Sequence, residues 1–249
     1  MKRNTLSIAV ALLMSSLGAN LAWASTNFKI DPATASNYIR DGIYISPYTA
    51  DIGINGVPTL VICDDFADEV AFNETWQANV STLSTVASSG ADVKWATDPG
   101  VSGYNEQNSY NEAAWLTTQL LLPANQVSNL TEAEISYAIW AVFDANGPLG
   151  VKAWLLQPAY NDTTVYNAVF GSNGLLYQAS LHSGDSFPNV LVYTPVTGTE
   201  SCCGTPQEFL AVQTVRADEA STITTFGFDF TCLAVLLYFF RRHLSAKLN

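Results

Sequence analysis

Histidine, cysteine and basic side chains are scarce in this sequence. Its 249 residues include 2 His, 4 Cys, and 10 Lys and Arg against 22 Asp and Glu, which gives a formal net charge of −12. Such acidity repels phosphate backbones, so we expect no nucleic-acid partner. The sequence also lacks the glycine-rich phosphate loop, the His-Glu-x-x-His pair and the Gly-x-Ser-x-Gly elbow that mark common enzyme classes. We therefore expect a protein that is not an enzyme.

A hydrophobic run stands near each end of the sequence. The first, residues 6–21, follows a basic start, is too short to cross a bilayer, and precedes Ala22-Trp23-Ala24. A basic start, a short apolar run and a small-x-small site are typical of a secretory signal peptide. The sequence therefore predicts a signal peptide over residues 1–24, cleaved between Ala24 and Ser25, and an exported protein.

The second run, residues 222–240, is long enough to cross a hydrocarbon core at about 1.5 Å per residue. Asp229 interrupts it, at a cost of roughly 2.5–3.5 kcal/mol that the surrounding apolar residues offset. Arg241 and Arg242 follow the run, and positive charge stays on the cytoplasmic side. We expect a single transmembrane helix that anchors the chain, at least transiently, with its bulk outside the cell.

The tail as a whole resembles a degenerate PEP-CTERM sorting signal over residues 218–249. The resemblance rests on the acidic start at Asp218 and Glu219, the single hydrophobic run, and the terminal pair Arg241 and Arg242. It implies an exosortase-type processing enzyme as partner and delivery to the cell envelope, the outer surface or the extracellular space. The alternative interpretation is a plain C-terminal membrane anchor.

Residues 25–217 have the pattern of one α+β ectodomain. Apolar stretches at 42–50 and 57–63 flank Asn55-Gly56, a tight-turn signal, and a third strand pattern covers 69–80 with a break near Asn73. Helical spacing follows at 110–121, from 131 to 144, and around 151–157; strand patterns return at 189–194 and 207–213. We expect an antiparallel, sandwich- or barrel-like domain with a central helical insertion.

The second predicted helix has an explicit start and an explicit buried face. Thr131 and Glu134 form a capping box, in which each side chain satisfies a free backbone amide of the other. Apolar residues then recur at helical spacing, at Ile135, Ala138, Ile139, Val142 and Phe143. This face is expected to be buried.

The ectodomain resembles two groups of proteins. Its motifs Val61-Ile-Cys-Asp-Asp-Phe66, Tyr110 to Leu116 and Pro206 to Leu210 resemble an uncharacterised group of exported PEP-CTERM proteins. A strand that ends in Ile62-Cys63 and a helix reading Ala138-Ile-Trp140 are also distantly similar to thioester domains of bacterial surface adhesins. Those domains join a Cys to a Gln, and the residue that matches the Gln is Ser136. Other glutamines that the resemblance leaves open are Gln119 and Gln126.

Cys63 has two competing interpretations. In an oxidising compartment it is expected to form a disulfide with Cys202 or Cys203, which would staple the first hairpin to the last strand region. This is the favoured interpretation. The alternative is a covalent adhesin that reacts through a thioester or another reactive form of Cys63.

An acidic cluster follows Cys63. Its members Asp64, Asp65, Asp68 and Glu69 are candidate Ca²⁺ ligands, because this ion takes several carboxylate oxygens and is abundant outside cells. The simpler interpretation is a solvated turn. Paired carboxylates drawn from this cluster or from Glu112 could also serve glycoside chemistry. No cofactor is otherwise expected.

The leading hypothesis is thus a non-enzymatic, exported cell-surface or matrix protein that binds envelope or exopolysaccharide material. A second alternative, after the covalent adhesin, is a carbohydrate-active enzyme or polysaccharide-binding module. Tryptophans that lie mostly in the core would simply fill the fold, whereas an exposed pair would favour a polysaccharide-binding site; the residues in question are Trp76, Trp95, Trp115, Trp140 and Trp154.

Overall fold

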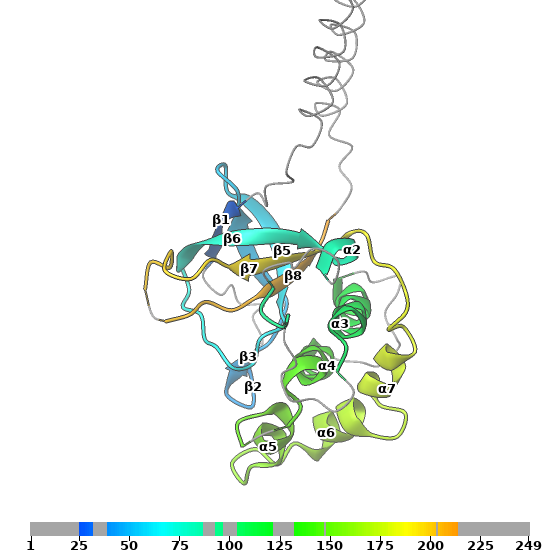
Figure 1. The fold of residues 1–249 in the computed structure, drawn as a ribbon. Coiled ribbons are helices and arrows are strands. Elements are labelled where there is room, and N and C mark those ends of the chain that lie inside the picture. The colour runs from blue at the N-terminus through cyan, green and yellow to red at the C-terminus, as the bar shows by residue number, and fades with distance from the viewer. Residues whose placement is uncertain are drawn as a thin grey trace, which may run out of the picture. The chain divides into compact units, whose positions relative to one another are not determined.

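Six antiparallel strands form a closed barrel in this computed structural model, which describes residues 25–31, 39–86, 93–96, 104–121, 132–146, 148–202 and 204–213 (Figure 1). The strands are β1 Ser25–Ile30, β4 Tyr48–Ile52, β5 Val57–Cys63, β6 Thr75–Thr82, β7 Val190–Pro195 and β8 Phe209–Val212. Their order around the barrel is β1-β4-β5-β8-β7-β6, and β1 pairs with both β4 and β6. A separate two-stranded sheet contains β2 Ile39–Arg40 and β3 Ile43–Tyr44.

The described helices all lie between β6 and β7 in the chain and beside the barrel in space (Figure 1). They are α2 Leu83–Val86, α3 Glu106–Leu121, α4 Glu132–Asp144, α5 Val151–Leu156, α6 Thr163–Phe170 and α7 Leu175–Ser180. Although the helical insertion separates β6 from β7 in sequence, the two strands pair directly, from Ala78 opposite Pro195 to Thr82 opposite Leu191. The expected antiparallel β-rich domain with helices is confirmed, and it is consistent with the α+β class.

The predicted first hairpin is present as β4 and β5, with a longer turn than expected. Ile52 is opposite Val57, so four residues, 53–56, connect the strands instead of the two expected at Asn55-Gly56. Gly53 and Gly56 both have positive φ, at 82° and 58°, and the Gly56 N–H donates to the Gly53 carbonyl at 3.2 Å. Glycine adopts this backbone region without steric cost, which allows the wider turn.

The third strand begins later than the alternation predicts. β6 starts at Thr75, and the stretch before it is an irregular loop that contains Asn73 with φ of 66°. The carboxylate of Glu74, which is 2% exposed, accepts a hydrogen bond from the Ala71 N–H at 2.9 Å. Local side-chain-to-backbone bonding of this kind competes with the sheet ladder. Residues 64–74 are consequently free to form one wall of a pocket.

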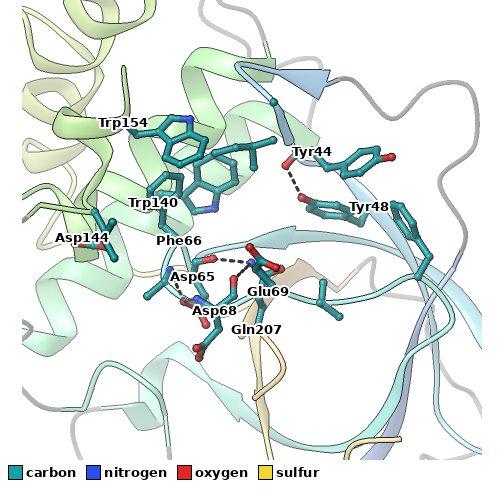
Figure 2. Close-up of a pocket in the computed structure, with 16 residues that line it drawn as sticks. Tyr44, Tyr48, Asp65, Phe66, Asp68, Glu69, Trp140, Asp144, Trp154 and Gln207 are labelled. Atoms are coloured by element: carbon teal, nitrogen blue, oxygen red, sulfur yellow. Dashed lines mark hydrogen bonds between the residues drawn. The ribbon is translucent and has the colours of Figure 1, made fainter. Parts of the chain in front are cut away.

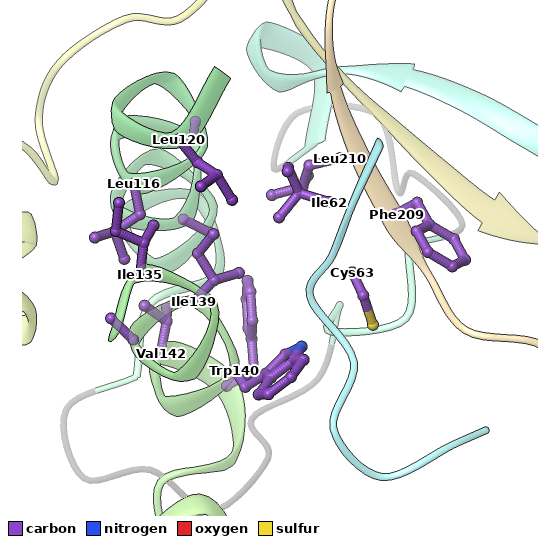
Figure 3. Close-up of a cluster of buried hydrophobic side chains, with 14 of the residues drawn as sticks. Ile62, Cys63, Leu116, Leu120, Ile135, Ile139, Trp140, Val142, Phe209 and Leu210 are labelled. Atoms are coloured by element: carbon purple, nitrogen blue, oxygen red, sulfur yellow. The ribbon is translucent and has the colours of Figure 1, made fainter. Parts of the chain in front are cut away.

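Helix α4 lies at the centre of the core, between the barrel and the other helices. Its predicted apolar face packs on β5, and α3 packs on β8 (Figure 3). The helix is also buried well beyond that face, since Ser136 and Tyr137 have no exposed surface. A helix enclosed on all sides must satisfy its polar groups internally. This enclosure fixes the position of α4 next to the end of β5.

Contacts of the chain divide it into residues 1–213 and 214–249, and every described residue belongs to the first unit. Helices of the described ranges are all too short or too polar to cross a membrane. The predicted signal peptide, residues 1–24, and the sorting tail, residues 218–249, lie outside the described residues, as does Thr131 of the predicted capping box.

Candidate functional site

A pocket of about 530 Å³ lies where the loop after β5 meets β3 and helices α4 and α5 (Figure 2). Two kinds of side chain dominate its lining. The aromatic members are Tyr44, Tyr48, Phe66, Phe72, Trp140 and Trp154. The acidic members are Asp65, Asp68, Glu69 and Asp144. Its size is within the range of about 300–1,000 Å³ that is usual for ligand pockets.

Phe66 is the centre of the aromatic wall. Its ring centroid lies 5.3 Å from that of Trp140 and 5.9 Å from that of Trp154, with the second pair edge to face. These separations are those of favourable aromatic pairs. The indole Nε1 atoms of both tryptophans are buried. The half-buried Trp154 therefore offers carbon surface, not a hydrogen-bond donor, to a ligand, whereas Trp140 is only 2% exposed and mainly supports the wall.

Lys94 fixes the acidic turn that borders this wall. Its ammonium forms ion pairs with Asp65 and with Asp68, the second at 2.7 Å. The other oxygen of Asp65 accepts the N–H groups of Ala67 at 3.1 Å and Asp68 at 3.2 Å. Gln207 Nε2 donates to the carbonyls of Asp65 at 2.9 Å and Asp68 at 2.6 Å. The loop is thus held by bonds from residues far away in the sequence.

Burial and ion pairing shift the pKa values of Asp65 and Lys94. Burial raises the pKa of Asp65 above its ordinary value, although the Lys94 ammonium opposes the shift. Burial alone lowers the pKa of Lys94, but attraction from Asp65 and its hydrogen bonds to Asp65 and Asp68 outweigh this, so the pKa is raised. Each partner therefore stabilises the charged form of the other.

Asp144 and Glu69 are the pocket carboxylates that no described residue neutralises through an ion pair. Asp144 closes helix α4 and is partly buried, whereas Glu69 is exposed. Burial raises the pKa of Asp144, the charge of Asp65 adds to the shift, and Lys94 opposes it. A ligand with positive charge would remove the cost of keeping this carboxylate ionised.

The candidate calcium ligands do not surround one point. Asp64 turns into the core, Asp65 and Asp68 bind Lys94, and Glu69 is at the surface. Among the described residues, no three acidic, His or Cys side chains are grouped as a metal ion requires. Calcium binding by this cluster stays a prediction.

A second pair of carboxyl groups, Asp64 and Glu208, is completely buried beneath the pocket. Glu208 accepts hydrogen bonds from the Tyr110 hydroxyl at 2.5 Å, the Lys94 N–H at 2.9 Å and the Thr194 hydroxyl. The oxygens of Asp64 meet no such donor among the described residues. Burial, followed by the charge of Glu208, raises the pKa of Asp64 well above its ordinary value. Burial raises the pKa of Glu208 as well, but its three donors oppose that shift, so Asp64 is the member that holds a proton more readily.

Cys63 is a free thiol with no exposed surface. Its Sγ donates to the Asp65 carbonyl at 3.1 Å, and Trp140 lies beside it (Figure 3). Burial, followed by the charges of Asp65 and Asp64, raises the pKa of this thiol well above its ordinary value. The thiolate, which is the nucleophilic form, is therefore disfavoured.

The favoured disulfide from Cys63 to Cys202 or Cys203 is absent from the structure, which is a correction to the sequence interpretation. Cys63 is enclosed between the barrel and α4, whereas Cys202 is exposed in the loop before β8 and is disulfide-bonded without Cys63. Cys203 lies outside the described residues. Sequence alone gave no sign that the end of β5 would be covered by a helix.

Ser136 is linked to Cys63 through Ser46. The Cys63 N–H donates to Ser46 Oγ at 3.0 Å, and the Ser46 N–H donates to Ser136 Oγ at 3.1 Å. Ser46 therefore links the end of β5 to α4. Gln119 lies on α3, and its side-chain oxygen is buried without a described hydrogen-bond partner; Gln126 lies outside the described residues.

Sequence reasoning missed Lys94, Gln207 and Glu208 as parts of this region. Lys94 interrupts a Ser- and Gly-rich stretch, and the other two begin a strand pattern, so neither context predicts a role. Their partners are 14 to 142 positions away. The one available signal was the scarcity of basic residues, because an isolated Lys in an acidic chain is a natural partner for a buried carboxylate.

Comparisons with known proteins reveal only distant likeness. No protein-family model and no curated protein matches the chain. The pilus-presented adhesin Cpa matches over 67% of this chain and 41% of its own, with 14% identity and a TM-score of 0.38. The N-terminal thioester domain of fibronectin-binding protein SfbI from Streptococcus pyogenes matches over 76% and 93%, with 10% identity and a TM-score of 0.39. The chain thus spans less than half of the first structure.

Proposed function

We propose that this chain is a non-enzymatic, exported cell-surface or extracellular-matrix protein whose barrel-and-helix domain binds polysaccharide of the cell envelope in the pocket beside Phe66. Export through residues 1–24 and sorting through residues 218–249 by an exosortase-type enzyme are parts of this proposal, and they rest on the sequence patterns at the two ends. A hydrophobic tail helix would tether the chain to the membrane before processing.

The observation that carries the proposal is the composition of the pocket. Aromatic surfaces of Phe66, Trp140 and Trp154 form one wall, and the carboxylates of Glu69 and Asp144 are near them (Figure 2). Carbon faces of sugar rings pack against aromatic side chains, and hydroxyl groups donate to carboxylates. A pocket with both features has what saccharide recognition requires.

Binding without catalysis fits the state of the carboxyl groups. Glycoside hydrolysis uses two carboxyl groups that act on one bond, one as acid and one as base or nucleophile. Here Asp65 and Asp68 are neutralised by Lys94, and the protonated Asp64 is enclosed in the core. The proposal accordingly assigns the acidic turn to structure and ligand contact, not to proton transfer.

Covalent attachment through Cys63 has less support than reversible binding. The thiol is buried, its pKa is raised, and the α4 residue closest to it in the hydrogen-bond chain is Ser136. A serine side chain has no acyl group with which to form a thioester. We therefore favour the pocket over the thiol as the functional site.

Titration calorimetry of the purified full chain with oligosaccharides released from its own envelope tests the proposal. We expect binding that Trp154→Ala weakens by about tenfold or more, as for loss of a buried aromatic contact. Tyr177→Ala removes an aromatic residue that is 52% exposed on α7 and does not line the pocket, so it should bind like the parent. Absence of saccharide binding, or equal losses in both variants, would overturn the proposal.

Intact-mass measurement of the chain from native envelopes tests the export and sorting parts separately. We expect an N-terminus at Ser25 and a C-terminus near Glu219. If the chain keeps residues 222–240, these residues act as a plain membrane anchor and the sorting proposal is wrong. If it keeps residues 1–24, the predicted cleavage of a signal peptide is wrong.

A further inference from the structure

The pocket is rich in hydrogen-bond acceptors and poor in side-chain donors. Among the residues that the structure describes, its lining includes no Lys, Arg or His. The two N–H bonds of the Gln207 amide are both used within the protein, on the Asp65 and Asp68 carbonyls. The Tyr48 hydroxyl donates to the Tyr44 carbonyl at 2.6 Å. With the tryptophan Nε1 atoms buried, only the Tyr44 hydroxyl remains as a side-chain donor for a ligand.

The pocket also has an excess of negative charge. Four carboxylates line it, and the one ammonium paired with any of them is that of Lys94, which binds Asp65 and Asp68 from outside the lining. A neutral ligand that displaced water from Asp144 would leave this carboxylate without a counter-charge, and burial of an unpaired charge is costly. An ammonium group has three donors, no acceptor and the required charge.

The aromatic wall also favours a ligand with a positive charge. A cation within about 6 Å of an aromatic face is attracted by the quadrupole of the ring, and Trp is the best of these rings. The chain already uses this contact elsewhere, since the Lys94 ammonium lies 5.0 Å from the centre of the Trp95 ring. Phe66 and Trp154 line the same pocket as Asp144, so the lining offers a cation both an aromatic face and a carboxylate.

We propose that the saccharide bound in this pocket is an amino sugar with a free ammonium group, so that the domain distinguishes N-unsubstituted from N-acetylated hexosamine units. This inference rests on the function proposed above. The ammonium would bind at Asp144, and the carbon face of the ring would pack on Phe66 or Trp154. N-acetylation would remove the charge and add a carbonyl that the acceptor-rich pocket cannot satisfy.

A matched pair of ligands tests the inference. Calorimetry at pH 6 compares the glucosamine trisaccharide with the N-acetylglucosamine trisaccharide on the full chain. We expect the free amine to bind at least about tenfold more tightly, the usual worth of a charge-assisted hydrogen bond. Equal affinities would overturn this inference and leave the proposed saccharide binding intact, whereas no binding of either ligand or of envelope oligosaccharides would overturn both. A lysine tripeptide that binds as tightly as the amino sugar would overturn the choice of a saccharide.

A matched pair of variants separates the pocket from the general acidity of the chain. Asp144→Asn removes the unpaired carboxylate of the pocket, and Asp185→Asn removes an exposed carboxylate beside His182. Each lowers the negative charge by one, so non-specific attraction of a cation changes equally. We expect about a tenfold loss of affinity for the glucosamine trisaccharide in the first variant alone. Equal affinities of the two variants would overturn the inference.

Discussion

The Asp64 N–H donates to the Glu208 carbonyl at 3.4 Å, the carboxyl groups of both residues are fully buried, and burial raises the pKa of each. Three donors stabilise the charge of Glu208, from Tyr110, Thr194 and the backbone of Lys94. Because the two groups interact strongly, they titrate as a pair. The asymmetry in their donors nevertheless assigns the proton to Asp64 in the folded chain.

This pair predicts a loss of stability at high pH. The pKa of Asp64 is raised in the folded state, so its contribution is fully present below the unfolded value of about 3.9 and is lost as pH rises through the folded value. Asp64→Asn cannot ionise, and its amide can still donate to Glu208. We expect its unfolding free energy, relative to the parent, to rise by about 1–3 kcal/mol between pH 5 and pH 8 in urea titrations.

Asp31→Asn is the control for that experiment, because Asp31 pairs at the surface with Lys29, whose charge does not change between pH 5 and pH 8. Its difference from the parent should stay constant over the same pH range. A constant difference for Asp64→Asn as well would show that Asp64 is not the protonated group.

Lys94 is predicted to stabilise the fold through the buried Asp65. The Asp65 carboxylate has no exposed surface, so Lys94→Ala would leave a buried charge without its partner. We expect a loss of about 3 kcal/mol in unfolding free energy. Adding Asp65→Asn should restore part of this loss, because the remaining group is then neutral. The four proteins of this double-mutant cycle are compared by urea unfolding.

Lys29 is a natural control for Lys94. It also pairs with two aspartates, Asp31 and Asp51, but does so at the surface of β1 and β4. Lys29→Ala should therefore change stability little, as is usual for exposed ion pairs. Similar losses for the two lysine variants would refute the importance of burial at Asp65.

Cys63 is predicted to be chemically inert in the folded chain. Its thiol is buried and its pKa is raised, so iodoacetamide should modify it only after denaturant is added. Peptide mapping of the modified chain gives the measurement. Methylamine uptake that vanishes in Cys63→Ala, or a mass deficit of one ammonia in the peptide that contains Cys63, would instead restore the covalent adhesin alternative.

The local sequence pattern predicted the helices and strands whose formation depends least on pairing with distant parts of the chain. The apolar spacing from Ile135 to Phe143 predicted α4 because a helix repeats its face regardless of what covers it. The hairpin followed from a turn signal between two apolar runs. By contrast, β1 was missed, because Ser25–Ile30 mixes polar and apolar residues and becomes a strand only by pairing with β4 and β6.

The candidate site is built from contacts between residues that are far apart in the sequence, and the sequence pattern does not reveal such contacts. Asp65 was predicted to be acidic surface or a calcium ligand, yet Lys94 and Gln207 enclose it from 29 and 142 positions away. The aromatic residues Trp140 and Trp154 were recognised, but their contact with Phe66 depends on how α4 and α5 pack on the loop. The sequence therefore predicted which residue types line the pocket, whereas the fold determines which of these residues are in contact.

Gly42 provides a test of the wall of the pocket. It has φ of 79°, and a Cβ at this position would lie 2.6 Å from the Tyr160 hydroxyl oxygen. Tyr160 packs on Trp154 with centroids 5.5 Å apart, so Gly42→Ala should push Tyr160 away from the wall. Gly198 has a similar φ of 83° with no atom within 4 Å, which makes Gly198→Ala a control with the same backbone strain of roughly 1–2 kcal/mol.

We expect Gly42→Ala to lower the unfolding free energy by about 1 kcal/mol more than Gly198→Ala, because it loses the Tyr160–Trp154 contact in addition to the strain. The same variant should weaken binding of the glucosamine trisaccharide, whereas Gly198→Ala should bind like the parent. Urea unfolding and calorimetry measure the two effects. Identical behaviour of the variants in both would mean that Tyr160 does not support the pocket, and that the wall formed by Phe66 and Trp154 holds its shape without it.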